Sequence, residues 1–502
     1  MKKTTLMVMI VTIIAKIFGF ARDKMMTYFF GVGVVSDAFM LTFGVPSMVL
    51  TVVAAAFVTG FIPMYTRVKN EDPDEANAFA NNIFNIMVAF SLVMGVFMFL
   101  FPDVIVKIYA AGFDKATHAL ASSFVRIVSV SVLFVAIIQL GTGYLNVNQS
   151  FILPNVLSIP SNLIIIGVAF VSFRANNTRL LPYGAVAGYA VQGIIMYLYM
   201  KRFGFKYKVV FDFKDPHLIR MVTIAAPLLI STLILSLQDL VMMSSSTLIH
   251  GKGGYSLIMM SSRLMGFATG LFVTGVLSVA YPTISHAASK NDKVKVIHSM
   301  NDAILLISLF IIPASIGFIT LSYELVAFVY GGGKVTAKEL VVLSNIFKGA
   351  SLGLFFIAIK DLFTRMHYAY QDALTPLRAQ VIHSVIAVIL FVALGSTMGI
   401  SGITLAVSIA TLISTIYLFK SLLGKFKRLG MQTIIKDFLK IVISGIAMGL
   451  AIFIARPILV TKMSANLSLV VILILAVLVY GSFILILRVQ VFYDLFSRKK
   501  TA

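Results

Sequence analysis

Apolar runs of about twenty residues, separated by short polar segments, recur along the whole chain, and a run of this length is enough to cross the hydrocarbon of a bilayer. The pattern predicts an all-α polytopic membrane protein with about 14 transmembrane helices. The expected spans are 4–20, 34–62, 80–101, 120–145, 152–173, 182–200, 219–248, 255–283, 299–320, 339–364, 377–395, 399–419, 434–455 and 466–487.

The composition excludes a soluble globular domain. Of the 502 residues, 59% are hydrophobic and only 12% are charged, and the mean hydropathy is +0.99. Such values are typical of a membrane protein. The absence of cysteine excludes disulfides, thiolate metal sites and cysteine nucleophiles. Because the chain also lacks tryptophan, Tyr and Phe are expected to form its interfacial belts.

Lys and Arg are distributed unevenly between the two sides of the predicted bundle. With the N-terminus inside, the cytoplasmic segments hold roughly twice as many of them as the opposite loops, which follows the positive-inside rule. The excess is concentrated in 201–220 and 420–436. We therefore expect a multi-pass protein of the bacterial cytoplasmic (inner) membrane with both termini in the cytoplasm. This bias explains much of the net charge of +22, so no nucleic-acid partner is expected.

Two short sequence matches indicate an internal duplication. Phe57 to Gly60 recurs as Phe272 to Gly275, and Gln149 stands five residues before a proline, as Gln371 does. The matches occur in the same order with similar offsets, which favours parallel repeats with a binding site between them. The predicted organisation is a six-helix bundle, a basic cytoplasmic linker, a second six-helix bundle, and two additional transmembrane helices with a tail, over 1–200, 201–218, 219–420 and 421–502.

Charged residues inside the spans are the candidates for function. A cation at mid-bilayer costs about 2.5 to 3.5 kcal/mol on insertion scales, so it normally faces protein or a watery cavity. Arg22, Asp23 and Lys24 lie near the end of the first apolar segment, which Gly31 and Gly33 are expected to end before a second helix begins at Val34. The alternative is that this group only marks the water boundary of the first helix. The other cations within or beside spans are Lys16, Arg126, Arg263, Lys348, Lys360, Lys440 and Arg488.

Several segments resemble the signatures of the MurJ (MviN) family of lipid II flippases, within the multidrug/oligosaccharidyl-lipid/polysaccharide exporter superfamily. These segments are GFARD at 19–23, SDAF at 36–39, SSRLMGFATGLFVTGVLSVAYPTIS at 261–285 and YAYQDALTPLR at 368–378. The resemblance implies fourteen helices and a central cavity in which arginines of helices 1 and 8 engage a lipid-linked pyrophosphate. By motif, Arg22 and Asp23 match the pair on helix 1, Lys16 stands where an arginine is usual, and Arg263 matches the arginine of helix 8.

The candidate substrate-binding residues combine this resemblance with the charge pattern. They are Lys16, Arg22, Asp23, Asp37, Arg263, Lys348 and Lys360. Arginine can hold phosphate oxygens with a planar fork of donors, whereas lysine supplies a compact charge.

Simpler roles are open for several of these side chains. Arg263 could pair with a buried acid such as Asp239, and the two lysines Lys348 and Lys360 could snorkel or pair with Asp361. His383 is expected to be a hydrogen-bonded core residue, and Arg126 lies near an expected helix end.

The chain departs from the family pattern in two places. Helix 2 of the family often carries charges, yet Pro46 to Pro63 has none. Some members bind sodium through carboxylates and amides on helices 7 and 11, but span 377–395 contains neither Asp nor Asn. We therefore expect no sodium site of that pattern and no metal or other cofactor, and we expect the membrane potential to drive transport.

The expected function is translocation of the lipid-linked peptidoglycan precursor lipid II, an undecaprenyl-pyrophosphate-linked sugar, from the inner to the outer leaflet by alternating access. Alternatives are a flippase for an O-antigen or capsule unit on the same type of lipid, and a multidrug antiporter. A membrane-embedded glycosyltransferase would carry acidic residues in a substantial external domain, so we expect a transporter and no enzyme. The expected partners are the lipid-linked substrate, membrane lipids and other cell-wall synthesis proteins.

Overall fold

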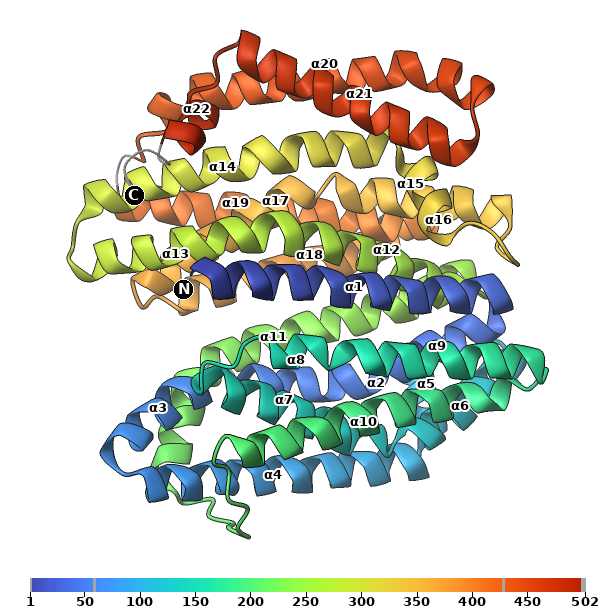
Figure 1. The fold of residues 1–502 in the computed structure, drawn as a ribbon, viewed down its shortest axis with the longest axis vertical. Coiled ribbons are helices and arrows are strands. Elements are labelled where there is room, and N and C mark those ends of the chain that lie inside the picture. The colour runs from blue at the N-terminus through green and yellow to red at the C-terminus, as the bar shows by residue number, and fades with distance from the viewer. Residues whose placement is uncertain (1, 57–59, 427–428, 498–502) are drawn as a thin grey trace. The chain divides into compact units, whose positions relative to one another are not determined.

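The computed structural model describes residues 2–56, 60–426 and 429–497, and this part of the chain is built of helices without a β-strand (Figure 1). Within the described residues, ten helices are long and apolar enough to cross a membrane, and a pair bent by 54°, Lys115–Val128 with Ser131–Val147, makes an eleventh candidate. The predicted all-α polytopic class is confirmed. The count of fourteen spans stays a prediction.

The chain packs as two compact units, of which the first contains residues up to Met259 together with Gly332–Thr336. In this unit α1 packs on α9, α2 packs on α6 and α11, and α10 packs on α7 and α9. Its helices are α1 Lys2–Phe30, α2 Val34–Ala56, α3 Ile62–Glu71, α4 Pro73–Leu100, α5 Pro102–Tyr109, α6 Lys115–Val128, α7 Ser131–Val147, α8 Leu153–Val156, α9 Ser158–Arg174, η2 Thr178–Leu180, α10 Leu181–Arg202, α11 Pro216–His250 and the first turn of α12 Gly254–Ala268.

The second unit contains Met260–Gly331 and Ala337–Ala502. Here α18 packs on α19, which also contacts α16 and α17, while α14 contacts α13, α17 and α20. After the remainder of α12, its helices are η3 Thr269–Val273, α13 Thr274–Ser289, α14 Lys293–Thr320, α15 Ser322–Tyr330, α16 Ala337–Ser351, α17 Leu354–Ala369, α18 Leu374–Met398, α19 Ile400–Phe426, α20 Met431–Lys462, α21 Ala465–Ile486 and α22 Gln490–Ser497.

The predicted break after the first span is confirmed. α1 ends at Phe30 and α2 begins at Val34, and between them Gly31 and Gly33 have φ of +73° and +149°. An L side chain rarely adopts such angles, whereas glycine does so without a steric penalty. The two glycines therefore let the chain leave one helix and enter the next within three residues.

The two C-terminal helices α20 and α21 form an integral part of the second unit (Figure 1). Apolar side chains of both helices pack with Leu321 in one buried cluster. The Tyr480 hydroxyl donates a hydrogen bond of 2.7 Å to the Leu309 carbonyl, and the Arg456 guanidinium pairs with Glu324 at 2.6 Å. Both polar contacts join these helices to the α14–α15 segment, so α20 and α21 are held by specific bonds as well as by apolar packing.

Gln149 and Gln371, which suggested the duplication, end their helices in the same way. They are two of the few described non-glycine residues with positive φ, at 59° and 57°. In each case the next amide reaches back five residues, from Ser150 to the Leu145 carbonyl at 2.9 Å and from Asp372 to the His367 carbonyl at 3.0 Å. This is the hydrogen bond of a Schellman helix end. The shared geometry favours the duplication; the match at Phe57 to Gly60 involves positions 57–59, which lie outside the described residues.

A second structural correspondence links α4 with α14. Asn81 on α4 donates to the carbonyl of Lys206, in the segment after α10, at 2.7 Å. Asn301 on α14 donates to the carbonyl of Leu429, in the segment after α19, at 3.1 Å. Each asparagine thus holds the chain where it leaves the last helix of a predicted six-helix bundle. The repeat boundaries themselves stay a prediction.

Asp37, in the first turn of α2, caps the beginning of α12. Its side chain is fully buried and accepts hydrogen bonds from the Gly253 amide at 2.6 Å, from the Ser256 amide at 2.8 Å and from the Ser256 hydroxyl at 2.5 Å. A carboxylate at a helix N-terminus satisfies amides that have no partner within the helix and interacts favourably with the helix dipole. This contact ties α2 to α12 within the first unit.

We predict that Asp37→Ala destabilises the protein, because two buried amides and a hydroxyl lose a charged acceptor. A hydrogen bond to a charged group contributes about 1.5 to 3 kcal/mol, so the melting temperature of the purified protein should fall by several degrees. Asp361→Ala is the matched control, since that carboxylate is 43% exposed and pairs with Arg365 at 3.5 Å. Equal melting temperatures for the two variants would contradict a structural role for the Asp37 cap.

Candidate functional site

Arg22 and Asp23 form a buried ion pair on α1. The Arg22 side chain is 8% exposed and that of Asp23 is 0% exposed, and Arg22 Nη2 lies 2.8 Å from Asp23 Oδ1. Arg22 Nε donates to the same oxygen at 2.9 Å. The guanidinium also lies over the ring of Phe43 on α2, with its carbon 4.3 Å from the ring centroid. The pairing and the cation–π contact hold the guanidinium in one orientation inside the first unit.

Lys16 and Asp37 are the other candidates in the first unit. Lys16 is half-buried on α1, about one and a half helical turns before Arg22. Asp37 is committed to the α12 cap described above, and its acceptor oxygens receive the Gly253 and Ser256 donors. Its contacts are those of a structural residue, and a direct role in substrate binding stays a prediction.

Arg263, Lys348 and Lys360 lie in the second unit. Arg263 is half-buried in α12, whereas Lys348 is exposed in the last turn of α16. Lys360 on α17 is half-buried, and its ammonium donates to Gln380 Oε1 on α18 at 3.1 Å. Gln380 in turn donates to the Ser384 hydroxyl at 3.1 Å, so Lys360 belongs to a small polar network between α17 and α18.

Asp361, which was considered as a partner for the two lysines, forms an ion pair with Arg365 at 3.5 Å, one helical turn away. The Arg365 guanidinium lies 5.7 Å from the ring centroid of Tyr281 on α13. The sequence reasoning missed Arg365 because it placed the end of the span at residue 364. The signal that could have found it is the Asp361–Arg365 spacing of four residues, which brings opposite charges together on one helix face.

The structure also shows the surroundings of His383 and Arg126. His383 is buried and its Nε2 lies 3.1 Å from the Thr411 hydroxyl, as expected for a hydrogen-bonded core residue. Arg126 is exposed in the last turn of α6, as expected for a residue at a helix end.

The YAYQDALTPLR segment covers the end of α17, the loop 370–373 and the first residues of α18. Asp372 accepts from the Thr375 amide at 3.1 Å and from the Thr375 hydroxyl at 2.9 Å, and it lies 2.9 Å from His367 Nδ1. Burial acts to raise the pKa of this carboxyl, but the hydrogen bonds from Thr375 and His367 outweigh burial and leave the pKa below its ordinary value. Asp372 and Thr375 of this segment therefore have a structural role, because their hydrogen bonds hold the chain at the start of α18.

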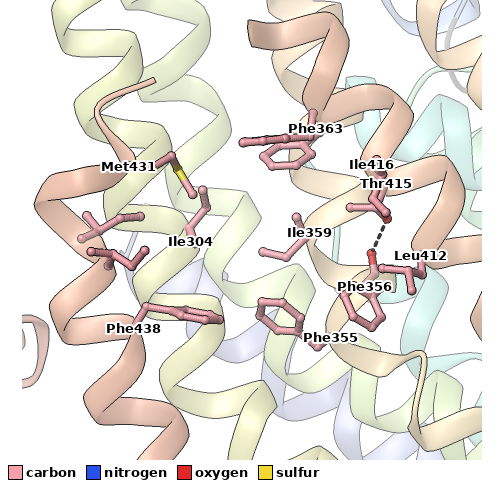
Figure 2. Close-up of a pocket in the computed structure, with 13 residues that line it drawn as sticks. Ile304, Phe355, Phe356, Ile359, Phe363, Leu412, Thr415, Ile416, Met431 and Phe438 are labelled. Atoms are coloured by element: carbon pink, nitrogen blue, oxygen red, sulfur yellow. Dashed lines mark hydrogen bonds between the residues drawn. The ribbon is translucent and has the colours of Figure 1, made fainter. Parts of the chain in front are cut away.

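An apolar cavity of about 300 Å³ lies in the second unit between α14, α17, α19 and α20. Figure 2 shows the aromatic rings and branched side chains that surround it, and the hydroxyl of Thr415 donating to the Phe356 carbonyl at 3.2 Å. The hydroxyl is therefore satisfied within the protein, and the cavity offers a ligand a hydrocarbon surface. Its lining residues are Ile304, Phe355, Phe356, Ile359, Phe363, Leu412, Thr415, Ile416, Phe419, Met431, Ile434, Ile435 and Phe438.

The seven predicted site residues divide between the units. Lys16, Arg22, Asp23 and Asp37 belong to the first, and Arg263, Lys348 and Lys360 to the second. That the two groups converge on one ligand stays a prediction. Among the described residues, no three His, Asp or Glu side chains are grouped so that they could hold a metal ion.

Comparison with known proteins identifies the family. The family described as "Lipid II flippase MurJ" matches residues 26–480. The "Lipid II flippase MurJ" of Thermosipho africanus is 27% identical over 449 residues, covering 88% of this chain and 89% of that protein. The "Probable lipid II flippase MurJ" of Thermotoga maritima is 25% identical over 507 residues, covering 99% and 98%.

Comparison with solved structures indicates the same family. A "Lipid II flippase MurJ, inward closed conformation" superposes with a TM-score of 0.79 at 25% identity, covering 98% of this chain and 99% of that one. An inward-facing multidrug resistance MATE transporter gives a TM-score of 0.67 at 16% identity over 83% of this chain and 95% of that one, which shows a shared fold. Since the family match runs from the first helix into α21, the chain belongs to the MurJ family.

Proposed function

We propose that this protein translocates lipid II from the inner to the outer leaflet of the bacterial cytoplasmic membrane, as a transporter without catalytic activity. The observation that carries the proposal is the match to the lipid II flippase family over residues 26–480. We further propose that both termini are cytoplasmic, which is supported by the excess of Lys and Arg in the predicted cytoplasmic segments, mainly 201–220 and 420–436. Other cell-wall synthesis proteins are the proposed partners beyond the substrate and the membrane lipids.

The chemistry of the described side chains suits the two ends of such a substrate. Arg22 offers a guanidinium that Phe43 and Asp23 hold in place, and arginine is the side chain best suited to bind phosphate oxygens bidentately. The apolar cavity beside α20 offers a hydrocarbon surface to a polyprenyl chain. Asp23 leaves the Arg22 site with little net charge, so a dianionic pyrophosphate needs further cations, for which Lys16 and Arg263 are the candidates.

A flippase for another polyprenyl-pyrophosphate sugar is the second candidate function, since it would use the same cations and the same apolar surface. Depletion of the protein in its native cell distinguishes the two. We expect lipid II to accumulate on the cytoplasmic side, because its synthesis continues while its removal stops. Accumulation of a different lipid-linked sugar, with normal lipid II turnover, would replace the proposed substrate with that one.

We predict that Arg22→Ala or Arg263→Ala weakens lipid II binding by roughly tenfold or more, because each removes charge-assisted hydrogen bonds of about 1.5 to 3 kcal/mol. Arg→Lys should restore binding only in part, since the charge survives without the fork. Binding to the purified proteins is the measurement. The matched control is Arg126→Ala, which removes an exposed arginine at a helix end and should bind normally.

If Arg263 is a structural partner of Asp239, its removal should change the stability of the protein and leave lipid II binding unchanged. Arg263→Ala would then lower the melting temperature, and adding Asp239→Asn would restore it, because the buried carboxylate would no longer be left without a counter-charge. Unchanged lipid II affinity in both Arg→Ala proteins would remove the two arginines from the proposed site.

We also predict that the membrane potential drives the transport. An inside-negative potential favours outward movement of an anion by about 2.3 kcal/mol per charge per 100 mV, and a pyrophosphate carries up to two charges. Dissipating the potential in proteoliposomes or cells should therefore slow flipping, while replacing sodium with potassium should have little effect. A strict requirement for sodium at constant potential would overturn this proposal.

A further inference from the structure

In the segment that joins α10 to α11, charged and apolar residues alternate except at Val210. From Lys206 to Lys214 the sequence reads KYKVVFDFK, with apolar side chains at every odd position. Residues 205–212 form neither a helix nor a turn. In extended backbone, successive side chains point to opposite faces. The segment 206–214, called here the linker strand, therefore has an apolar face and a more polar face, although it belongs to no β-sheet.

Four asparagines of α4 hold the backbone of the linker strand. The Lys206 amide donates to Asn77 at 3.0 Å, and the Lys208 amide donates to Asn81 at 2.7 Å. Asn85 donates to the carbonyls of Lys208 and Val210 at 2.9 and 3.0 Å.

The fourth asparagine fixes the far end of the strand. Asn82 accepts from the Asp212 amide at 2.8 Å and donates to the carbonyl of the same residue at 2.7 Å. Because these backbone groups are paired by side chains, the strand keeps an extended shape without a partner strand. The asparagines thus act as a substitute for a neighbouring strand along one edge.

The position of the asparagines places the linker strand at the level of the lipid headgroups. α4 has 28 residues, which correspond to about 42 Å of helix at 1.5 Å per residue, whereas the hydrocarbon core is about 30 Å thick. Asn77 to Asn85 lie toward the polar end of this helix and the later turns are apolar, so the excess of about 12 Å, or about eight residues, falls at this end. It reaches from Pro73 to about Asn81, and Asn85 lies about one turn further in. The strand therefore lies beside the membrane interface.

The apolar face of the linker strand is open on the protein surface. Val209 is 74% exposed, Phe211 54% and Phe213 68%, while Tyr207 is 48% exposed and also contacts Phe84. Four adjacent exposed apolar side chains on a fixed backbone are unfavourable in water and mark an interaction surface. In a chain that has no tryptophan, Phe and Tyr at this level are suited to the interfacial role.

The charged side chains of the linker strand stand at even positions, on the face opposite to the apolar one, and carry a small positive excess. Lys206, Lys208 and Lys214 are all exposed. Asp212 accepts from the Lys214 amide at 2.8 Å, and Asp215 accepts from the His217 amide at 2.8 Å at the start of α11. These amides do not neutralise the two carboxylates, so the three lysines leave a net charge of +1 over 206–215. Basic residues next to an apolar face attract anionic lipid headgroups.

We propose that the linker strand is a docking surface for the anionic phospholipids of the leaflet on the predicted cytoplasmic side. Tyr207, Val209, Phe211 and Phe213 insert among the headgroups and upper acyl chains, and the long lysine side chains reach back from the opposite face to the lipid phosphates. The asparagines of α4 hold the strand in the orientation that this contact requires. The surface is separate from the proposed lipid II site and its test does not depend on transport.

The absence of tryptophan allows a direct test, because Phe211→Trp gives the full chain a single tryptophan. The variant is placed in nanodiscs of phosphatidylcholine and phosphatidylglycerol, with lipids brominated near the top of the acyl chain. We expect emission at short wavelength and strong quenching by the bromines. Phe453→Trp, at a 74% exposed position of the spanning helix α20, is the reference for lipid contact, and N-acetyltryptophanamide is the reference for water. Water-like emission without quenching overturns the proposal.

A charge variant tests the lysines. We expect phosphatidylglycerol vesicles to raise the melting temperature of the detergent-purified protein, and we expect this rise to shrink in K206Q/K208Q/K214Q. The matched control, K290Q/K293Q/K295Q, removes Lys290 between α13 and α14 and Lys293 and Lys295 in the first turn of α14, and it should retain the full rise. An equal loss in both variants would show a general charge effect only. No loss in either would show that lipid phosphates do not bind the linker strand, and either result rejects the proposed lysine contacts.

Discussion

A polar group in the hydrocarbon of a membrane has no water to bond, so it must find its partner inside the protein. This constraint explains most of the structure. It makes the spanning segments helical, because a helix pairs its own backbone groups. It also explains the many hydroxyls that bond to a carbonyl of the preceding turn, such as Thr142 to Ile138 and Ser308 to Ile304, both at 2.7 Å.

The same constraint determines how the charged side chains are stabilised. Arg22 is paired with Asp23 and covered by Phe43, and Lys360 is bonded to Gln380. Each cation thus has a neutralising or polar neighbour in the absence of a ligand, which avoids an unpaired buried charge. A phosphate ligand would compete with these neighbours, so its binding energy is the difference between two sets of hydrogen bonds.

Helix ends are where the constraint is most demanding, because the first amides and last carbonyls of a helix lack internal partners. Asp37 accepts hydrogen bonds from the first amides of α12, and the left-handed backbone of Gln149 and Gln371 lets the chain satisfy carbonyls at the ends of α7 and α17. The asparagines Asn81 and Asn301 extend the same solution to the segments that leave each predicted bundle. Shared hydrogen-bond geometry of this kind is stronger support for a duplication than a four-residue match in apolar sequence.

The sequence alone determined the helical membrane class, the break between the first two helices and the family resemblance. These depend on features that are local along the chain, namely apolar run length, the angles open to Gly31 and Gly33, and short motifs around Arg22 and Arg263. Only the tertiary structure decided the partners of the polar side chains. Asp37 is hydrogen-bonded to Ser256, and Asn85 to Lys208. The partners are so far apart in the sequence that their spacing does not predict these contacts. A hydrogen bond depends on which distant segments pack together, and that is determined by the packing of whole helices.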